Sequence, residues 1–230
     1  QTNVSEATVI QISNLWIHST TTNTGLGINA TNFVISKFSD IWMTGLNRGV
    51  LMNKTGTHYN TIENIRIGIG GVGSYGIYID GNSNENTIMR TRILPDGNST
   101  GVFINSHANS LYDVDVETNA NYSVYIGPSG HDTTMVGLYL EGNDKQLYIA
   151  PGAEATTIIG GFIVDGDTYN IVDEGSGTVY LNPRVQYEPY GFVTNATSIF
   201  NQQVNISTNL TVISRILSNT ISSSMQWINL

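Results

Sequence analysis

The sequence predicts an all-β protein built as a parallel β-helix, a coil of short strands stacked along one axis. Three observations carry this prediction. The composition disfavours helices, a segment of about 24 residues repeats along the chain, and apolar and polar residues alternate within each repeat.

The composition is poor in charge and rich in residues that make turns. Of 230 residues, 9 are Lys or Arg and 18 are Asp or Glu, and this 12% is about half of the ~25% usual for soluble domains. Asn, Thr, Ser and the 24 Gly dominate the remainder. Asn, Ser and Thr bond to their own backbone and compete with helical hydrogen bonds, and Gly costs about 1 kcal/mol inside a helix. The same residues suit short strands joined by turns.

Charge and cysteine content exclude several classes of function. The net charge of −9 argues against nucleic acids and anionic membranes, because both attract a basic surface. No apolar run approaches the ~18 residues of a membrane span, so we expect no membrane insertion. The absence of Cys removes disulfides, thiolate nucleophiles and Cys-based metal sites. The chain begins at Gln1 without a Met or a signal peptide, which we interpret as a processed or excised piece.

Two series of alternating segments define the repeat. The first series is ISNLWIH from Ile12, FSDIWMT from Phe38, IENIRIG from Ile62, IMRTRIL from Ile88, LYDVDVE from Leu111, MVGLYLE from Met135 and IGGFIVD from Ile159. Members of the second series (GVLMN, GIYID, GVFIN, SVYIG and others) follow members of the first. One repeat cannot bury its apolar face alone, whereas repeats stacked ~4.8 Å apart can. The series predicts seven coils and a degenerate eighth at 185–193.

The repeats divide the chain into two parts. Residues 1–195 form the predicted β-helix, and residues 196–230 break the pattern. Apolar residues in this last part recur every 3 or 4 positions, but the Ser, Thr and Asn between them favour strand. Two interpretations stay open: a segment that caps the open end of the rod, which solenoids require, and an oligomerisation segment.

Three segments carry a resemblance to a known group of proteins. NTIENIRI, YGIYIDGNSNENTI and GLYLEGND resemble coils of right-handed parallel β-helix proteins of the pectate-lyase-like superfamily, particularly viral and phage tailspike-type proteins. The resemblance covers about 9–195. It implies a right-handed coil and a homotrimer with an intertwined C-terminal part. It does not decide the function, because the superfamily holds lyases, hydrolases, adhesins and inert spikes.

Equivalent positions of a β-helix stack one rung apart, so candidate sites follow columns along the rod. Glu117, Glu141 and Asp165 occupy one such column at spacings of 24 residues. Stacking places neighbouring carboxylates about 5 Å apart and the outer two about 9–10 Å apart, which brackets the separations in glycosidases. Like charges this close raise a pKa, as a general acid requires. The three are candidate catalytic residues of a glycoside hydrolase or, less favoured, a polysaccharide lyase.

Two other interpretations of these carboxylates stay open. They can end strands at turns, where they accept backbone N–H bonds, or they can hold Ca²⁺. No other cofactor is indicated, and the four His are scattered along the sequence.

A second column mixes aromatic and charged residues. Its members are Trp16, Trp42, Arg66, Arg92, Asp115 and Tyr139. Rings that stack on sugars, and charged groups that bond hydroxyls or sugar carboxylates, make this a candidate glycan-binding face. Arg66 and Arg92, one rung apart, could neutralise a uronate. The alternative is an exposed strand surface without a role.

A third column, in the second series, is aromatic: Tyr78, Phe103, Tyr125 and Tyr148. An apolar stripe outside a sheet indicates an interface, with another chain or a covering loop, or else a groove in which sugar rings stack.

Columns of Asn and Asp have a structural interpretation. They are Asn14, Asp40, Asn64 and Asp113 in the first series, and Asn29, Asn53, Asp80 and Asn105 in the second. Such side chains bond to one another between rungs and tolerate left-handed backbone. Glycosylation sequons at Asn98, Asn121 and Asn195 are candidate modification sites, with Asn98 in an expected loop.

These observations support three hypotheses of function. The first is a surface-exposed spike or attachment protein, extracellular or on a virion, that contacts host glycans as a homotrimer. The second is a polysaccharide-degrading enzyme on the same rod. The third is a structural spacer.

Overall fold

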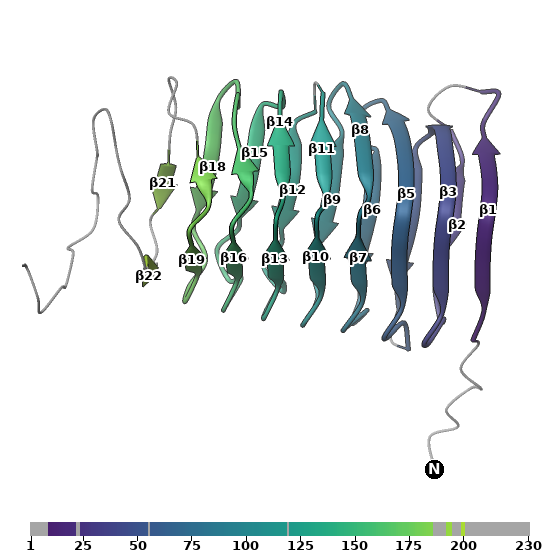
Figure 1. Ribbon diagram of the computed structural model, residues 1–230, viewed down its shortest axis with the longest axis horizontal. Coiled ribbons are helices and arrows are strands. Elements are labelled where there is room, and N and C mark those ends of the chain that lie inside the picture. Colours follow the sequence, from purple (N-terminus) through teal and green to yellow (C-terminus); the bar gives the residue numbers. More distant parts are fainter. Residues whose placement is uncertain are drawn as a thin grey trace, which may run out of the picture.

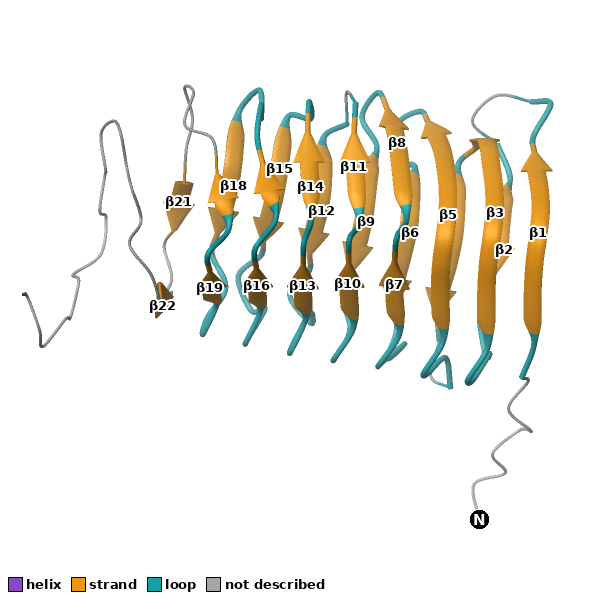
Figure 2. Ribbon diagram, viewed as in Figure 1, coloured by secondary structure: helices purple, strands orange, loops and turns teal. Residues whose placement is uncertain are grey.

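The structure is a computed structural model that describes residues 9–21, 24–54, 56–118 and 120–185, together with strands at 192–194 and 199–200. These residues form parallel sheets stacked as a β-solenoid of about seven turns, without a helix. The rungs lie side by side along the long axis (Figure 1), and strands alternate with short loops (Figure 2). The predicted all-β solenoid is confirmed. The described part of the chain has no helix long and apolar enough to cross a membrane.

The smaller sheet has one strand from each turn. It contains β2 (Leu26–Asn29), β4 (Arg48–Asn53), β6 (Tyr75–Asp80), β9 (Thr100–Ile104), β12 (Tyr122–Ile126), β15 (Lys145–Ile149), β18 (Tyr169–Asp173) and β21 (Phe192–Thr194). These strands pair in parallel with their neighbours on adjacent rungs, so side chains at equivalent positions form columns.

The larger sheet is formed by the first series of segments and is bent. Its 14 strands are β1 (Gln11–His18), β3 (Lys37–Leu46), β5 (Thr61–Gly70), β7 (Thr87–Met89), β8 (Arg92–Asp96), β10 (Ser110–Tyr112), β11 (Asp115–Glu117), β13 (Thr134–Val136), β14 (Tyr139–Glu141), β16 (Thr157–Ile159), β17 (Phe162–Ile163), β19 (Val179–Leu181), β20 (Arg184–Val185) and β22 (Ile199–Phe200). The first three turns contribute one long strand each. Later turns contribute two short strands separated by the bend.

One residue of each turn adopts left-handed backbone at this bend. This left-handed column is Asn14, Asp40, Asn64, Arg90, Asp113, Gly137, Gly160 and Asn182. Asn, Asp and Gly accept this conformation at the least steric cost, which explains most of the column. Asn64 also donates a hydrogen bond to Asp40 at 2.6 Å. The structural interpretation of the four predicted first-series residues is therefore confirmed.

The Asn and Asp residues of the second series behave differently. Asn105 bonds to Asp80 at 3.0 Å across one rung, as expected. None of Asn29, Asn53, Asp80 and Asn105 is among the residues with left-handed backbone, so that part of the prediction is wrong. These residues lie at strand ends where the turn continues through the following residue, as at Gly81 with φ of 60°.

The core is a stack of apolar side chains from both sheets. Ile62, Ile88 and Leu111 are fully buried on successive rungs, and burial of each such side chain contributes about 1.5–3 kcal/mol. The interior is narrow beside β6 and β9. A Cβ atom on Gly76 would lie 2.5 Å from both the Gly101 carbonyl oxygen and Ile93 Cγ2, so only glycine fits there.

A buried asparagine ladder precedes the strands of the larger sheet. Asn60 Nδ2 donates to Asn86 Oδ1 at 2.9 Å, and Asn86 Nδ2 donates to Asn109 Oδ1 at 3.1 Å. The ladder satisfies buried polar groups that would otherwise destabilise the core. It was missed in the sequence, although its signal is visible there. Each of these Asn residues directly precedes a Thr or Ser that begins a strand.

The register of the last coils differs from the prediction. Met135 pairs with Ile158, and Tyr139 pairs with Phe162, so this coil is one residue shorter than expected. The sequence does not reveal this difference in coil length, because isoleucine occupies both of the positions, Ile158 and Ile159, that could pair with Met135. Ile158 is buried, whereas Ile159 is 37% exposed. The predicted stacking of Asp165 on Glu141 is therefore wrong.

The parallel stack continues past the predicted domain boundary at 195. Strand β22 pairs with β19 through Val179 and Ile199, which extends the larger sheet to Phe200. Residues 201–230, and with them most of the predicted capping or oligomerisation segment, lie outside the described residues. Both interpretations of that segment stay predictions.

Candidate functional site

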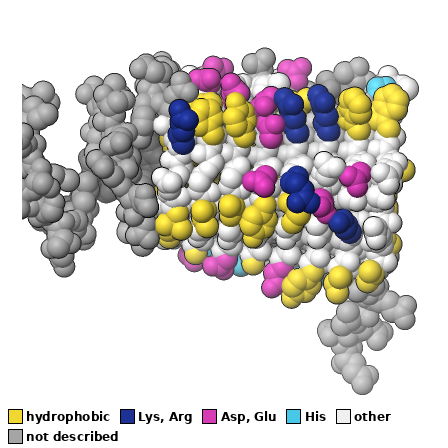
Figure 3. Space-filling model, viewed as in Figure 1, with side chains coloured by type: hydrophobic (Ala, Val, Ile, Leu, Met, Phe, Trp, Pro, Cys, Tyr) yellow, Lys and Arg dark blue, Asp and Glu magenta, His cyan; other side chains and the backbone are white. Residues whose placement is uncertain are grey.

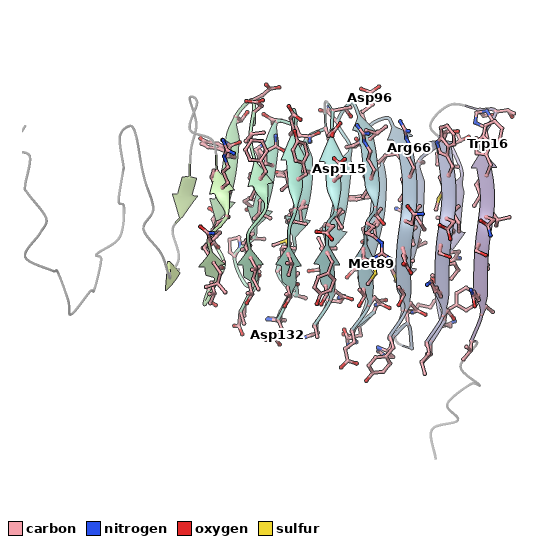
Figure 4. All side chains as sticks on the ribbon, viewed as in Figure 1. Trp16, Arg66, Met89, Asp96, Asp115 and Asp132 are labelled. Carbon is pink, nitrogen blue, oxygen red and sulfur yellow. The ribbon has the colours of Figure 1, made fainter. Side chains whose placement is uncertain are left out.

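The mixed column forms one continuous line along the larger sheet. Pairing from rung to rung joins Trp16, Trp42, Arg66, Arg92, Asp115, Tyr139, Phe162 and Arg184. Each lies two residues after a member of the left-handed column. The six predicted glycan-binding residues therefore lie together, and Phe162 and Arg184 extend them. The sequence pattern did not place these two in the column, because the predicted pairing after Tyr139 was one residue too late. The column is the upper row of coloured side chains in Figure 3, and Figure 4 labels Trp16, Arg66 and Asp115.

Two tryptophans form the first end of the column. Trp16 is 72% exposed and Trp42 is 50% exposed, and their ring centroids lie 6.2 Å apart. The Arg66 guanidinium carbon lies 5.3 Å from the centre of the Trp42 ring. These residues line a shallow groove that is also lined by Asn14, Asp40 and Asn64 of the left-handed column. The groove therefore offers open aromatic faces beside charged and amide groups.

Carboxylates and an arginine occupy the centre of the column. Arg92 Nη2 lies 2.5 Å from Glu117 Oε2, and Arg92 Nε lies 3.4 Å from Asp115 Oδ2. Glu117 pairs with Glu141 on the next rung, as the sequence predicted. Tyr139 donates its hydroxyl to Glu141 Oε2 at 2.6 Å. Asp165 does not join this group, because Ile163 pairs with Leu140 and Asp165 lies two residues further along.

Asp115 is a partly buried carboxyl group with a raised pKa. Burial, and then the negative charge of Glu117, raise the pKa of Asp115 to about 6, against the attraction of Arg92. Its Oδ1 atom is buried without a hydrogen-bond partner among the described residues. The hydrogen bond to Glu141 raises the pKa of Tyr139 to about 12, so that this hydroxyl stays a donor. Asp115 therefore has the raised pKa that a general acid requires.

This cluster has the components of proton-transfer chemistry. Glu117 and Glu141 are ~4.8 Å apart along the rod at the backbone level. The carboxyl group of Asp115 interacts directly with that of Glu117, and Arg92 is ion-paired with both. A sequence signal for Asp115 existed, since it lies on the same strand face as Glu117.

At the far end of the column, aromatic and cationic side chains again lie against one another. The Tyr139 and Phe162 ring centroids lie 5.6 Å apart, and the Arg184 guanidinium carbon lies 4.9 Å from the Phe162 ring. The charged centre is thus flanked by aromatic residues on both sides.

The smaller sheet carries a different aromatic surface, here called the tyrosine ladder. The predicted column of Tyr78, Phe103, Tyr125 and Tyr148 is continuous from rung to rung. Tyr75 and Tyr122 pack into it from the adjacent outward column, with ring centroids 4.9 Å from Tyr78 and 5.1 Å from Tyr125 respectively. The rings of the ladder are only partly exposed, because they cover one another. Its role as an interface stays a prediction.

Other predicted sites have the following surroundings. Asn98 is exposed in a turn, and Asn121 is half-buried and accepts a hydrogen bond from Lys145 Nζ at 3.3 Å. Asn195 lies outside the described residues. The solenoid stacks the rings of His107 and His131 with centroids 4.7 Å apart. Within the described ranges, no three His, Asp or Glu residues are grouped to hold a metal ion.

Comparison of the chain with protein-family models, with curated proteins and with solved structures finds no match. The structure supports a parallel β-solenoid, and the resemblance to tailspike-type proteins rests on the sequence segments alone.

Proposed function

We propose that the protein binds glycan chains along the mixed column. The observation that carries this proposal is the exposed pair Trp16 and Trp42, placed in one line with Arg66 and the Arg92–carboxylate cluster. Aromatic faces stack on sugar rings, and charged groups bond their hydroxyls and substituents.

The shape of the site favours a chain over a small molecule. Small-molecule sites are usually concave and bury most of their ligand. The groove here is shallow and follows the stacked rungs, with a side chain of the mixed column about every 4.8 Å. A linear polymer laid along the rod would contact several rungs at once, and many weak contacts would sum to useful affinity.

We place this activity on a surface spike, in line with the tailspike resemblance. In this proposal the rod is a homotrimer on an extracellular or virion surface and attaches to host glycans. The tyrosine ladder is the proposed contact between copies, because its rings form a continuous and partly exposed aromatic column on the smaller sheet. Sedimentation equilibrium of the full chain tests this part, and a monomer at all concentrations would contradict it.

Glycan binding is tested with a panel of polysaccharides and two matched variants. Trp42→Ala removes an exposed ring from the groove, whereas Tyr112→Ala removes a 37% exposed ring from the other arm of the same sheet. We expect Trp42→Ala to weaken binding at least about tenfold and Tyr112→Ala to leave it unchanged. Equal losses in the two variants, or no binding by the unmodified protein, would contradict the proposal.

Glycoside hydrolysis is a second candidate function, favoured by the raised pKa of Asp115 beside two further carboxylates. Asp115 would protonate the glycosidic oxygen as its bond to the anomeric carbon breaks. Glu117 or Glu141 would take a proton from the attacking water, whose oxygen bonds to the anomeric carbon. Release of reducing ends from a bound glycan tests this step. Asp115→Asn should abolish release and keep binding, and undiminished release would exclude this role.

A further inference from the structure

We infer that the tryptophan end of the groove, around Trp42 and Arg66, receives an anionic sugar residue that bears a carboxylate or a sulfate group. This inference names the class of ligand for the proposed glycan-binding function and rests on that function.

The first argument is the distribution of positive charge. The chain has nine Lys and Arg residues and a net charge of −9. Three of these nine, Arg66, Arg90 and Arg92, line this one groove. Asp40 also lines the groove, so the attraction of the groove for an anion depends on which of these arginines has no carboxylate partner.

The second argument concerns the ion pairs that each of these three arginines forms. Arg90 forms an ion pair with Glu63, and Arg92 is bound to Asp115 and Glu117. Among the described residues, no carboxylate forms an ion pair with Arg66. Its side chain is exposed and its guanidinium lies over the Trp42 ring. The N–H donors of Arg66 are therefore available to a ligand in the groove.

The third argument is the chemistry of that donor set. A guanidinium presents a planar fork of N–H groups that binds carboxylate, sulfate or phosphate oxygens in pairs, and such charged bonds are about twice as strong as neutral ones. The sugar ring that carries the anion can rest against the exposed indole faces. Asp40, which also lines the groove, stays ionised because the hydrogen bond from Asn64 lowers its pKa. Its negative charge disfavours an anion beside it, so the anionic group is expected at Arg66.

The smaller sheet provides a matched control outside the mixed column. The Arg48 guanidinium carbon lies 5.3 Å from the centre of the Tyr78 ring, the same distance as from Arg66 to the Trp42 ring. Arg48 therefore has the same cation–aromatic arrangement on the other sheet. A general electrostatic attraction would use both arginines, whereas the inferred subsite uses only Arg66.

The experiment compares three polymers with one backbone: unmodified dextran, carboxymethyl dextran and dextran sulfate. Dissociation constants are measured by titration calorimetry for the full chain and for Arg66→Gln, Arg48→Gln and Trp42→Ala. We expect an anionic polymer to bind at least about tenfold more tightly than dextran, with the preference lost in Arg66→Gln and kept in Arg48→Gln. The two anionic polymers distinguish a carboxylate from a sulfate ligand. Urea unfolding of the two arginine variants checks that both remain folded.

Three results would overturn the inference. They are equal affinity for neutral and anionic dextran, an anionic preference that survives in Arg66→Gln, and an equal loss of that preference in Arg48→Gln. If neutral glycans bind and Trp42→Ala removes that binding, the proposed glycan function stands and only the anionic ligand class fails. If neither these polymers nor the polysaccharide panel bind, both proposals fail.

Discussion

The two sheets of the solenoid both present aromatic columns to solvent, but the columns differ in how their rings are used. On the smaller sheet, Phe103 lies 4.9 Å from Tyr78 and 5.3 Å from Tyr125, and the rings of the ladder cover one another. On the larger sheet, Trp16 and Trp42 keep 72% and 50% of their surface exposed. The first arrangement stabilises the rod, and the second is available to a ligand.

The difference comes from the neighbouring columns. Beside the tyrosine ladder, the adjacent outward column supplies Tyr75 and Tyr122, which fill the spaces between rings. Across the bend from the two tryptophans lie Ser13 and Ser39, which are too small to cover an indole. An aromatic residue on the surface of a repeat therefore indicates a site where a sugar ring can stack only when neighbouring side chains leave the face of the aromatic ring open.

The largest effect that would test this comparison is on stability. Phe103→Ala removes a ring that packs against three others and should lower the free energy of unfolding by about 3–5 kcal/mol. Trp42→Ala removes a ring that is half exposed and should lower it by about 1 kcal/mol or less. Urea unfolding of both variants measures the difference. Similar losses in the free energy of unfolding would show that the rings of the two columns contribute equally to stability.

An intermediate effect is expected in the pH dependence of stability. Because burial raises the pKa of Asp115 to about 6, the folded protein binds this proton more tightly than the unfolded chain does, whose Asp pKa is about 3.9. Stability attributable to Asp115 is therefore full below pH ~4 and declines as pH rises to ~6, by about 1–2 kcal/mol after allowance for partial exposure.

The Asp115→Asn variant isolates this contribution. The difference in unfolding free energy between the variant and the original protein should change across pH 4 to 6 and level off above it. Ionisable groups that do not interact with Asp115 are common to both proteins and cancel in the difference. A difference that is flat with pH would mean that the pKa of Asp115 is not raised in the folded state.

The smallest effect concerns the hydroxyl groups of the ladder. Tyr78 donates to Asp80 Oδ2 at 2.8 Å, and Tyr78→Phe should lower the free energy of unfolding at pH 7 by about 0.5–1.5 kcal/mol. Burial, and then Asp80, raise the pKa of Tyr78 to about 12, so the bond persists through neutral pH. Tyr112→Phe, at an exposed ring outside the ladder, is the control and should change stability by less than about 0.5 kcal/mol. Equal effects would mean that the Tyr78 hydroxyl adds nothing to the ladder.

The sequence by itself determined the solenoid, the division into two sheets and most of the outward columns. These features follow from alternation along a strand and from the repeat of about 24 residues, and both are visible in consecutive residues. Six residues of the mixed column could be aligned from the sequence, because their pairing from rung to rung follows the repeat lengths visible in the first series of segments. They are Trp16, Trp42, Arg66, Arg92, Asp115 and Tyr139.

Only the tertiary structure decided which of these residues remain free for a ligand. The choice between Ile158 and Ile159, the pairing of Arg92 with Glu117, the position of the Arg66 guanidinium over Trp42 and the burial of Asp115 depend on contacts between rungs. Those contacts join residues more than 20 positions apart, and their energies are set by distance and solvent exposure in three dimensions. Local pattern therefore determined the strand face of most side chains, whereas packing determined the register of the last coils and the contacts that each side chain makes.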